Sequence, residues 1–118
     1  MLTHEDGRLF LSEPPWLFRF VATESEATDY SWSIVSRSPR TIVRVLRGAK
    51  MGTAFGLFDE ISAALQFPYY FGENWAALEE CINDLSWLPG DAYVVIVMNA
   101  LFVLNRDADS ELMTFLRV

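Results

Sequence analysis

The residues best suited to form a site lie in one stretch, which reads PYYFGENWAALEEC over residues 68–81. Its first part holds three consecutive aromatic side chains, Tyr69, Tyr70 and Phe71, which are costly to leave in water unless they pack or bind a partner. Any of the three can cover the core, and Tyr70 is the one that we expect to contact a partner. Proline before the aromatics and glycine after them predict a loop, in which Gly72 permits a left-handed backbone.

A helix is predicted directly after this loop, with Asn74 as its N-cap and Leu85 near its end. One sector of this helix is apolar, as an amphipathic helix requires; it comprises Trp75, Leu78, Cys81, Ile82 and Leu85. The other side is largely acidic; it comprises Ala76, Glu79, Glu80, Asn83 and Asp84. A run of charges alone more often marks a solvated helix face than a site. The aromatic loop beside it favours a docking surface.

The carboxylates of this stretch suit binding better than catalysis. Acid–base chemistry needs two carboxylates in different environments, one of them buried to raise its pKa. Adjacent residues such as Glu79 and Glu80 on an exposed helix face do not offer that. The one histidine, His4, has no evident catalytic partner. We therefore expect no enzyme and no cofactor, and one Cys with one His makes no metal site.

The formal net charge of −7 is distributed unevenly along the chain. No Lys, Arg or His occurs between Met51 and Asn105, a span with seven Asp or Glu residues. Residues 1–50 carry seven Lys or Arg and six Asp or Glu, so they are nearly neutral. This distribution argues against nucleic-acid binding, which needs a basic surface. It suits a cationic protein partner.

The composition and the single cysteine indicate a globular protein of the cytoplasm. The chain has 118 residues, 52% of them hydrophobic, which is enough for one core. Cys81 cannot form an intramolecular disulfide, which fits a reducing compartment, and its place on the apolar side of its helix favours a small buried side chain over a nucleophile. No signal peptide is expected at the start of the chain, and the apolar run at residues 93–98 is too short to cross a membrane.

The first third of the chain has weaker signals. Residues 1–15 are predicted to be an arm, and residues 16–118 a single domain. Residues 16–21 read as a strand, because they are aromatic and branched. Residues 23–38 are ambiguous, since helical spacing of apolar side chains, with Thr23 or Ser25 as a cap, competes with several serines.

Strands and helices then alternate. A strand is predicted over residues 41–46, followed by a helix over residues 53–66 with Phe55 in its apolar stripe and with Asp59 and Glu60 facing outward. This order predicts an α/β fold with a small parallel sheet and right-handed crossovers.

The last part of the chain predicts a second strand and two more helices. The apolar run over residues 92–98 does not alternate, which is typical of a parallel strand covered on both faces. A short helix is expected over residues 99–104, and Asp107 or Asp109 is expected to cap a final helix.

The loop and the acidic helix resemble the signature of the barstar family, which are small acidic inhibitors of barnase-type ribonucleases. The resemblance rests on the run from Pro68 to Trp75 and on the order of strands and helices over residues 41–105. It implies a barstar-like fold with an extra N-terminal segment. The family ordinarily has one more strand after the last helix, and none is predicted before Val118. Either the chain is clipped there or the strand at residues 16–21 compensates.

The resemblance also implies a function. Such a protein is a stoichiometric inhibitor that binds and occludes the active site of a cationic ribonuclease through the acidic helix and the aromatic loop before it. Glu80 stands where the family places the carboxylate that mimics a phosphate. The residues expected to bind the partner are Tyr70, Phe71, Gly72, Asn74, Ala76, Glu79, Glu80 and Asn83.

Three positions depart from the family pattern. Ala76 replaces a second contacting aspartate, Phe71 lacks the hydroxyl of a tyrosine, and Glu79 replaces a tryptophan. These departures favour a different target ribonuclease. The alternative is an acidic protein-binding module with a barstar-like fold whose partner is not a ribonuclease. The oligomeric state is left open by the sequence.

Overall fold

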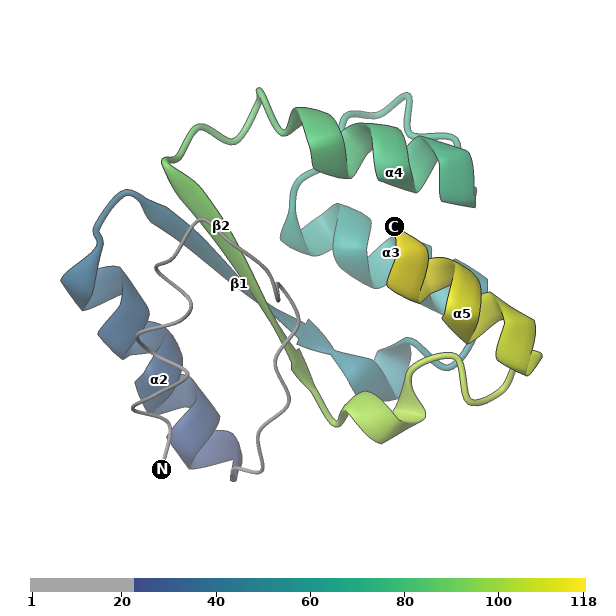
Figure 1. Cartoon of the computed structure of the whole chain (residues 1–118), viewed down its shortest axis with the longest axis horizontal. Helices are drawn as coiled ribbons and strands as arrows, with labels where there is room; N and C mark the ends of the chain where they lie inside the picture. The colour runs from purple at the N-terminus through teal and green to yellow at the C-terminus, as the bar shows by residue number, and fades with distance from the viewer. Residues whose placement is uncertain (1–22) are drawn as a thin grey trace. The chain divides into compact units, whose positions relative to one another are not determined.

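The structure, a computed structural model shown in Figure 1, describes residues 23–118. The chain divides into two units, residues 1–39 and residues 40–118, and each is described by itself. The predicted arm and the strand predicted at residues 16–21 lie outside the described residues. The boundary between that arm and a single domain stays a prediction.

Helix α2 (Glu24–Arg37) is the described element of the first unit, and it resolves the ambiguity of its serine-rich sequence. A capping box starts the helix, because the Thr23 hydroxyl accepts from the Glu26 N–H (3.1 Å) and the Glu26 carboxylate accepts from the Thr23 N–H (3.0 Å). The buried side chains follow helical spacing; they are Ala27, Tyr30 and Ile34. The cap and this apolar stripe outweigh the low helix propensity of serine.

The second unit is an α/β layer structure. Its elements are β1 (Thr41–Arg47), η1 (Gly48–Lys50), α3 (Ala54–Ala64), α4 (Trp75–Asp84), β2 (Ala92–Met98), η2 (Ala100–Phe102) and α5 (Asp109–Arg117). Strands β1 and β2 are parallel neighbours, with Leu46 opposite Val97. Figure 1 shows α3, α4 and α5 on one side of the two strands. The predicted class, a small parallel sheet flanked by helices, is confirmed.

The core of the second unit lies between the strands and these helices. Leu46 of β1, Leu57 of α3 and Leu78 of α4 are each at most 1% exposed. Burying a leucine fully contributes about 1.5–3 kcal/mol to stability. The full cluster comprises Leu46, Met51, Leu57, Phe58, Ile61, Leu65, Leu78, Leu85, Leu88, Val103 and Leu104. It therefore joins β1 to two helices and to the turns that follow β2.

Strand β2 is less buried than its apolar sequence predicts. Only Ile96 is buried, while Tyr93 is 38% and Val95 is 44% exposed. The expectation of complete cover on both faces is therefore wrong. The run of branched side chains instead reflects the preference of such residues for extended backbone.

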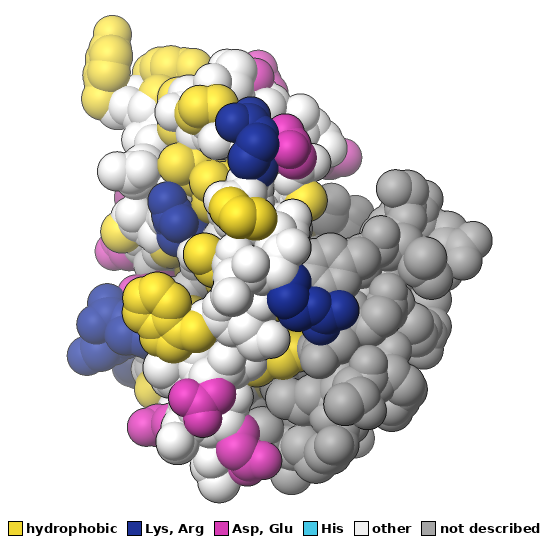
Figure 2. Space-filling model, turned by 90° about the vertical axis from the view of Figure 1, so that its left-hand side faces the viewer, with side chains coloured by type: hydrophobic (Ala, Val, Ile, Leu, Met, Phe, Trp, Pro, Cys, Tyr) yellow, Lys and Arg dark blue, Asp and Glu magenta, His cyan; other side chains and the backbone are white. Residues whose placement is uncertain are grey.

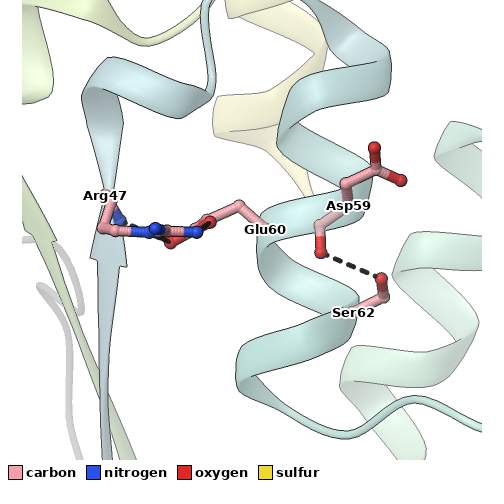
Figure 3. A network of polar contacts seen from close by, with 4 residues as sticks. All are labelled: Arg47, Asp59, Glu60 and Ser62. Carbon is pink, nitrogen blue, oxygen red and sulfur yellow. Dashed lines mark hydrogen bonds and ion pairs between the residues drawn. The ribbon is translucent and has the colours of Figure 1, made fainter.

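Helix α3 differs from the prediction at two positions. Phe55 is 70% exposed, because the buried stripe is centred on Leu57, Phe58 and Ile61 and Phe55 falls outside it. Glu60 is buried at 8% exposure, although it was expected to face outward. Figure 3 shows the reason: Glu60 points toward the arginine that ends β1, whereas its neighbour on the helix points elsewhere.

The start of α3 is held by two side chains. The Thr53 hydroxyl accepts from the Gly56 N–H at 3.2 Å. Asp107 was expected to cap the last helix, but its carboxylate instead accepts from the Ala54 N–H at 2.7 Å and so caps α3. The N-cap of α5 is Ala108, which makes no side-chain cap bond. Asp107 thus ties the segment before α5 to the start of α3.

Candidate functional site

Helix α4 begins at the predicted cap. The Asn74 side-chain oxygen accepts from the Ala77 N–H at 2.8 Å, as an N-cap does. At the other end Leu85 is left-handed, with φ 49°, and its N–H donates to the Cys81 carbonyl. Both ends are fixed by hydrogen bonds, so the helix is a rigid support for its outward side chains.

The outward side of α4 is the candidate docking surface. This acidic face comprises Ala76, Glu79, Glu80, Asn83 and Asp84, all of them exposed. Within residues 23–118 no ion pair involves its carboxylates, whereas Arg40 pairs with Asp91 at 2.9 Å and Arg47 with Glu60 at 2.8 Å. Within the described residues, the negative charge of the acidic face is therefore not compensated by an ion pair.

Other parts of the surface have a mixed character. Figure 2 shows a face on which Lys and Arg, Asp and Glu, and hydrophobic side chains all reach the surface. On the acidic face of α4 every charged side chain is negative. A field of one sign is thus a property of this helix, and such a field steers partners of the opposite sign.

The aromatic loop, residues 67–74, presents two tyrosines to solvent. Tyr69 is 101% and Tyr70 is 65% exposed. Their rings meet edge to face, with centroids 5.8 Å apart. Large exposed rings of this kind are common anchors in protein interfaces, because they bury much area at a low cost in side-chain entropy.

The third ring of the loop lies differently. Phe71 is half-buried, and its ring centroid is 4.9 Å from that of Phe67 and 6.0 Å from that of Phe58. It supports the loop from the core side. Phenylalanine suits this position, because its ring is half-buried against two other aromatic rings. A partner contact of Phe71 stays a prediction.

The backbone is left-handed just before α4. The residue concerned is Glu73, with φ 50°, whereas none of the described glycines has a positive φ. A left-handed residue other than glycine costs about 1–2 kcal/mol. Gly72 serves another purpose, since a Cβ there would lie 3.1 Å from the Asn74 side-chain nitrogen, which donates to the Gly72 carbonyl. The turn into α4 is thus strained at Glu73 and is held by the hydrogen bonds of the Asn74 side chain.

Cys81 lies on the buried side of α4, as predicted. Its burial raises the pKa of the thiol above its ordinary value, and the nearby carboxylates of Glu80 and Asp84 raise it further. The thiol therefore stays protonated at neutral pH, which makes it a poor nucleophile.

A contact that the sequence did not predict joins α4 to α5. The indole N–H of Trp75 donates to the Glu111 carboxylate at 2.7 Å. The Trp75 ring also lies 6.1 Å from the ring of Phe115, measured between centroids. Trp75 and Glu111 are 36 residues apart, so no local pattern links them.

The predicted partner-binding residues lie in one continuous segment. Most of them are exposed; these are Tyr70, Gly72, Asn74, Ala76, Glu79, Glu80 and Asn83. In the part of the chain that the structure describes, no group of three His, Cys, Asp or Glu side chains could hold a metal ion. None of the described helices is long and apolar enough to cross a membrane.

A comparison with known protein families shows which family the chain belongs to. A family model described as Barstar (barnase inhibitor) matches residues 41–118. The match covers more than half of the chain and every element from β1 to α5, so it extends past residue 105, where the resemblance read from the sequence ended. The comparison with curated proteins gives no match. On the strength of the family match, the chain belongs to the Barstar family.

Proposed function

We propose that this protein is a stoichiometric inhibitor that binds a cationic ribonuclease of the barnase type and occludes its active site. The contact surface would be the acidic face of α4 together with the aromatic loop. We propose no catalytic group, cofactor or nucleic-acid contact for it. We place it in the cytoplasm, where it would neutralise a ribonuclease inside the producing cell.

One observation carries the proposal: in a Barstar family member, Glu79, Glu80 and Asp84 are exposed on one rigid helix and have no ion-pair partner among the described residues. An enzyme that binds RNA phosphates carries basic side chains in its active site. Carboxylates held at the right spacing can take the place of phosphates and form charge-assisted hydrogen bonds with those side chains.

Rigidity and steering both support this mode of binding. Because the caps at Asn74 and Leu85 fix α4, little conformational entropy is lost when the carboxylates are bound. The one-sided charge also increases the rate of encounter with a cationic partner. Tyr70, exposed in the loop that leads into α4, would supply apolar contact area in addition to the charges.

Titration of barnase with the full chain, followed by RNA hydrolysis, tests the proposal. We expect activity to fall linearly to a break at one inhibitor per enzyme, and we expect no RNA hydrolysis by the chain alone. Stopped-flow association at several salt concentrations adds a second test, because steering is screened over about 10 Å at 0.1 M salt. An association rate constant that does not change with salt would contradict docking through the acidic face.

The alternative is an acidic module whose partner is not a ribonuclease. It is favoured by Ala76, which leaves the acidic face without a carboxylate one turn before Glu80, and by the inward position of Phe71. Capture of partners from a lysate of the source cell, with each basic partner then assayed for RNA hydrolysis, separates the two. A tight basic partner without ribonuclease activity would favour the alternative.

A further inference from the structure

We propose that Glu111 of α5 positions the docking surface by holding Trp75 at the first turn of α4. The proposal rests on the proposed function, because the surface that it positions is the acidic face with its aromatic loop. Glu111 would not touch the partner. It would act through Trp75, so that α5 helps to fix the position of the docking surface.

Trp75 sits where the loop becomes the helix. It is the first residue of α4 and follows the cap Asn74 directly. Its ring centroid lies 5.0 Å from that of Phe58 on α3 and 6.1 Å from that of Phe115 on α5. The ring thus contacts both neighbouring helices, and its orientation sets how the first turn of α4 lies against them.

Ring packing is not directional, and a hydrogen bond from the indole adds a constraint on which edge of the ring faces α5. The bond from the Trp75 Nε1–H to Glu111 Oε2 is 2.7 Å long and partly buried. This distance is that of a good N–H···O hydrogen bond, and a side-chain amide oxygen at the same place could accept from the indole N–H as a carboxylate oxygen does. Losing this bond would leave a partly buried N–H without its partner, which is unfavourable.

The same rings connect Trp75 to the loop. Phe58 contacts both Trp75 and Phe71, with centroid distances of 5.0 Å and 6.0 Å. Phe71 follows Tyr70 directly in the chain. A reoriented Trp75 would therefore disturb Phe58 and Phe71, and with them the presentation of Tyr70.

Four variants separate positioning from charge. Glu111→Gln keeps an oxygen acceptor for the indole N–H but removes the charge, whereas Glu111→Ala removes both. Asp109→Ala is the matched control, because Asp109 lies in the same first turn of α5, is exposed and makes no side-chain hydrogen bond among the described residues. Trp75→Phe removes the indole donor while keeping an aromatic ring.

The first measurement uses the free protein and needs no partner. The Phe71 N–H donates to the Pro68 carbonyl, and the Ala77 N–H donates to Asn74, so both amides report on the loop and the first turn. We expect Glu111→Ala and Trp75→Phe to speed hydrogen exchange at these amides by about tenfold, the effect of about 1.4 kcal/mol. Glu111→Gln and Asp109→Ala should stay within twofold of the parent. Unchanged exchange in Glu111→Ala would overturn the positioning role.

The second measurement is the dissociation rate from barnase. We expect Glu111→Ala to dissociate about tenfold faster than the parent and Glu111→Gln to dissociate at the parent rate. Glu111→Gln and Asp109→Ala should slow association equally, because each removes one negative charge. If Glu111→Gln dissociates as fast as Glu111→Ala, charge and not position is the cause, and the proposal is wrong. If the parent itself does not bind barnase, the proposed function fails for this enzyme, and the exchange data alone decide the role of Glu111.

Discussion

The carboxylate of Glu60 on α3 holds Arg47, the last residue of β1, by three hydrogen bonds. The Arg47 backbone N–H and its Nε each lie 2.9 Å from Glu60 Oε2, and its Nη2 lies 2.8 Å from Oε1 (Figure 3). The Arg47 side chain is largely exposed, whereas that of Glu60 is buried. The side-chain bond from Arg47 lowers the pKa of Glu60 despite the opposing effect of burial.

This pair predicts a loss of stability in acid. Because the folded-state pKa of Glu60 is lowered, its contribution is fully present above the ordinary carboxyl pKa of about 4.3 and is lost as the pH falls through the lower folded value. Glu60→Gln should therefore be less stable than the parent at pH 7, and this difference should shrink below about pH 4. Urea unfolding at a series of pH values measures it. Asp59→Asn, at the exposed neighbour, is the control, and a difference that is constant with pH would contradict the prediction.

Leu78 should be essential to the packing of α4. It is 0% exposed and belongs to the core cluster. Leu78→Ala should destabilise the fold by about 2–5 kcal/mol, as truncations of buried leucines do. Glu79→Ala, one residue further on the exposed side, should stay within about 0.5 kcal/mol. Equal urea midpoints for the two variants would show that this side of the helix is not the buried one.

Glu80 should matter for binding and not for folding. It is exposed, so Glu80→Ala should change stability by less than about 0.5 kcal/mol. Binding to a basic active site should weaken by about 2–5 kcal/mol, because the cationic groups of the partner would stay buried without their carboxylate. Calorimetric titration against barnase, with a thermal melt of each variant, measures both effects.

The control for Glu80→Ala is Glu24→Ala, which removes the same charge from an exposed position on α2. Equal weakening by the two variants would mean that only the net charge matters. Unchanged binding by a folded Glu80→Ala would remove the acidic face from the site.

Ala76→Asp should strengthen binding to a barnase-type enzyme. The side chain at this position is exposed and lies one helical turn before Glu80. A carboxylate in the first turn of α4 is favoured by the helix dipole, although like charges four residues apart cost about 0.2–0.5 kcal/mol. A lower dissociation constant for barnase, with Ala76→Ser as a neutral polar control, is the expected result. No difference between the two variants would count against a second cationic subsite at this position.

The local elements could be predicted because their signals are local. Asn74 supplies a cap, and the spacing of Leu78, Cys81 and Leu85 supplies a buried stripe, so α4 is found within a residue of its predicted ends. Glu60 could not be predicted in the same way. Glu60 lies three residues after Leu57 on the buried side of α3, and Arg47, thirteen residues earlier, supplies the partner that allows its charge to be buried there.

In the candidate site, too, the features set by local sequence could be predicted and those set by long-range contacts could not. The exposure of Tyr70 and Glu80 follows from the sequence of one loop and one helix. The bond of Trp75 to Glu111, and the use of Asp107 to cap α3, depend on how α5 packs in space. Tertiary contacts of this kind are not visible in the spacing of residues along one helix. A helix wheel therefore shows which face is exposed to solvent but not which side chains hold the helix in place.

The burial of Cys81 makes the rate of its reaction with a thiol reagent a measure of local opening. Its thiol is on the buried side of α4 and only 8% exposed, so a thiol reagent should reach it mainly through local opening of the structure around this helix. The rate of labelling therefore reports how often the structure around α4 opens. A bound partner that clamps α4 would slow the label without touching the sulfur, so one residue outside the docking surface would report occupancy of that surface.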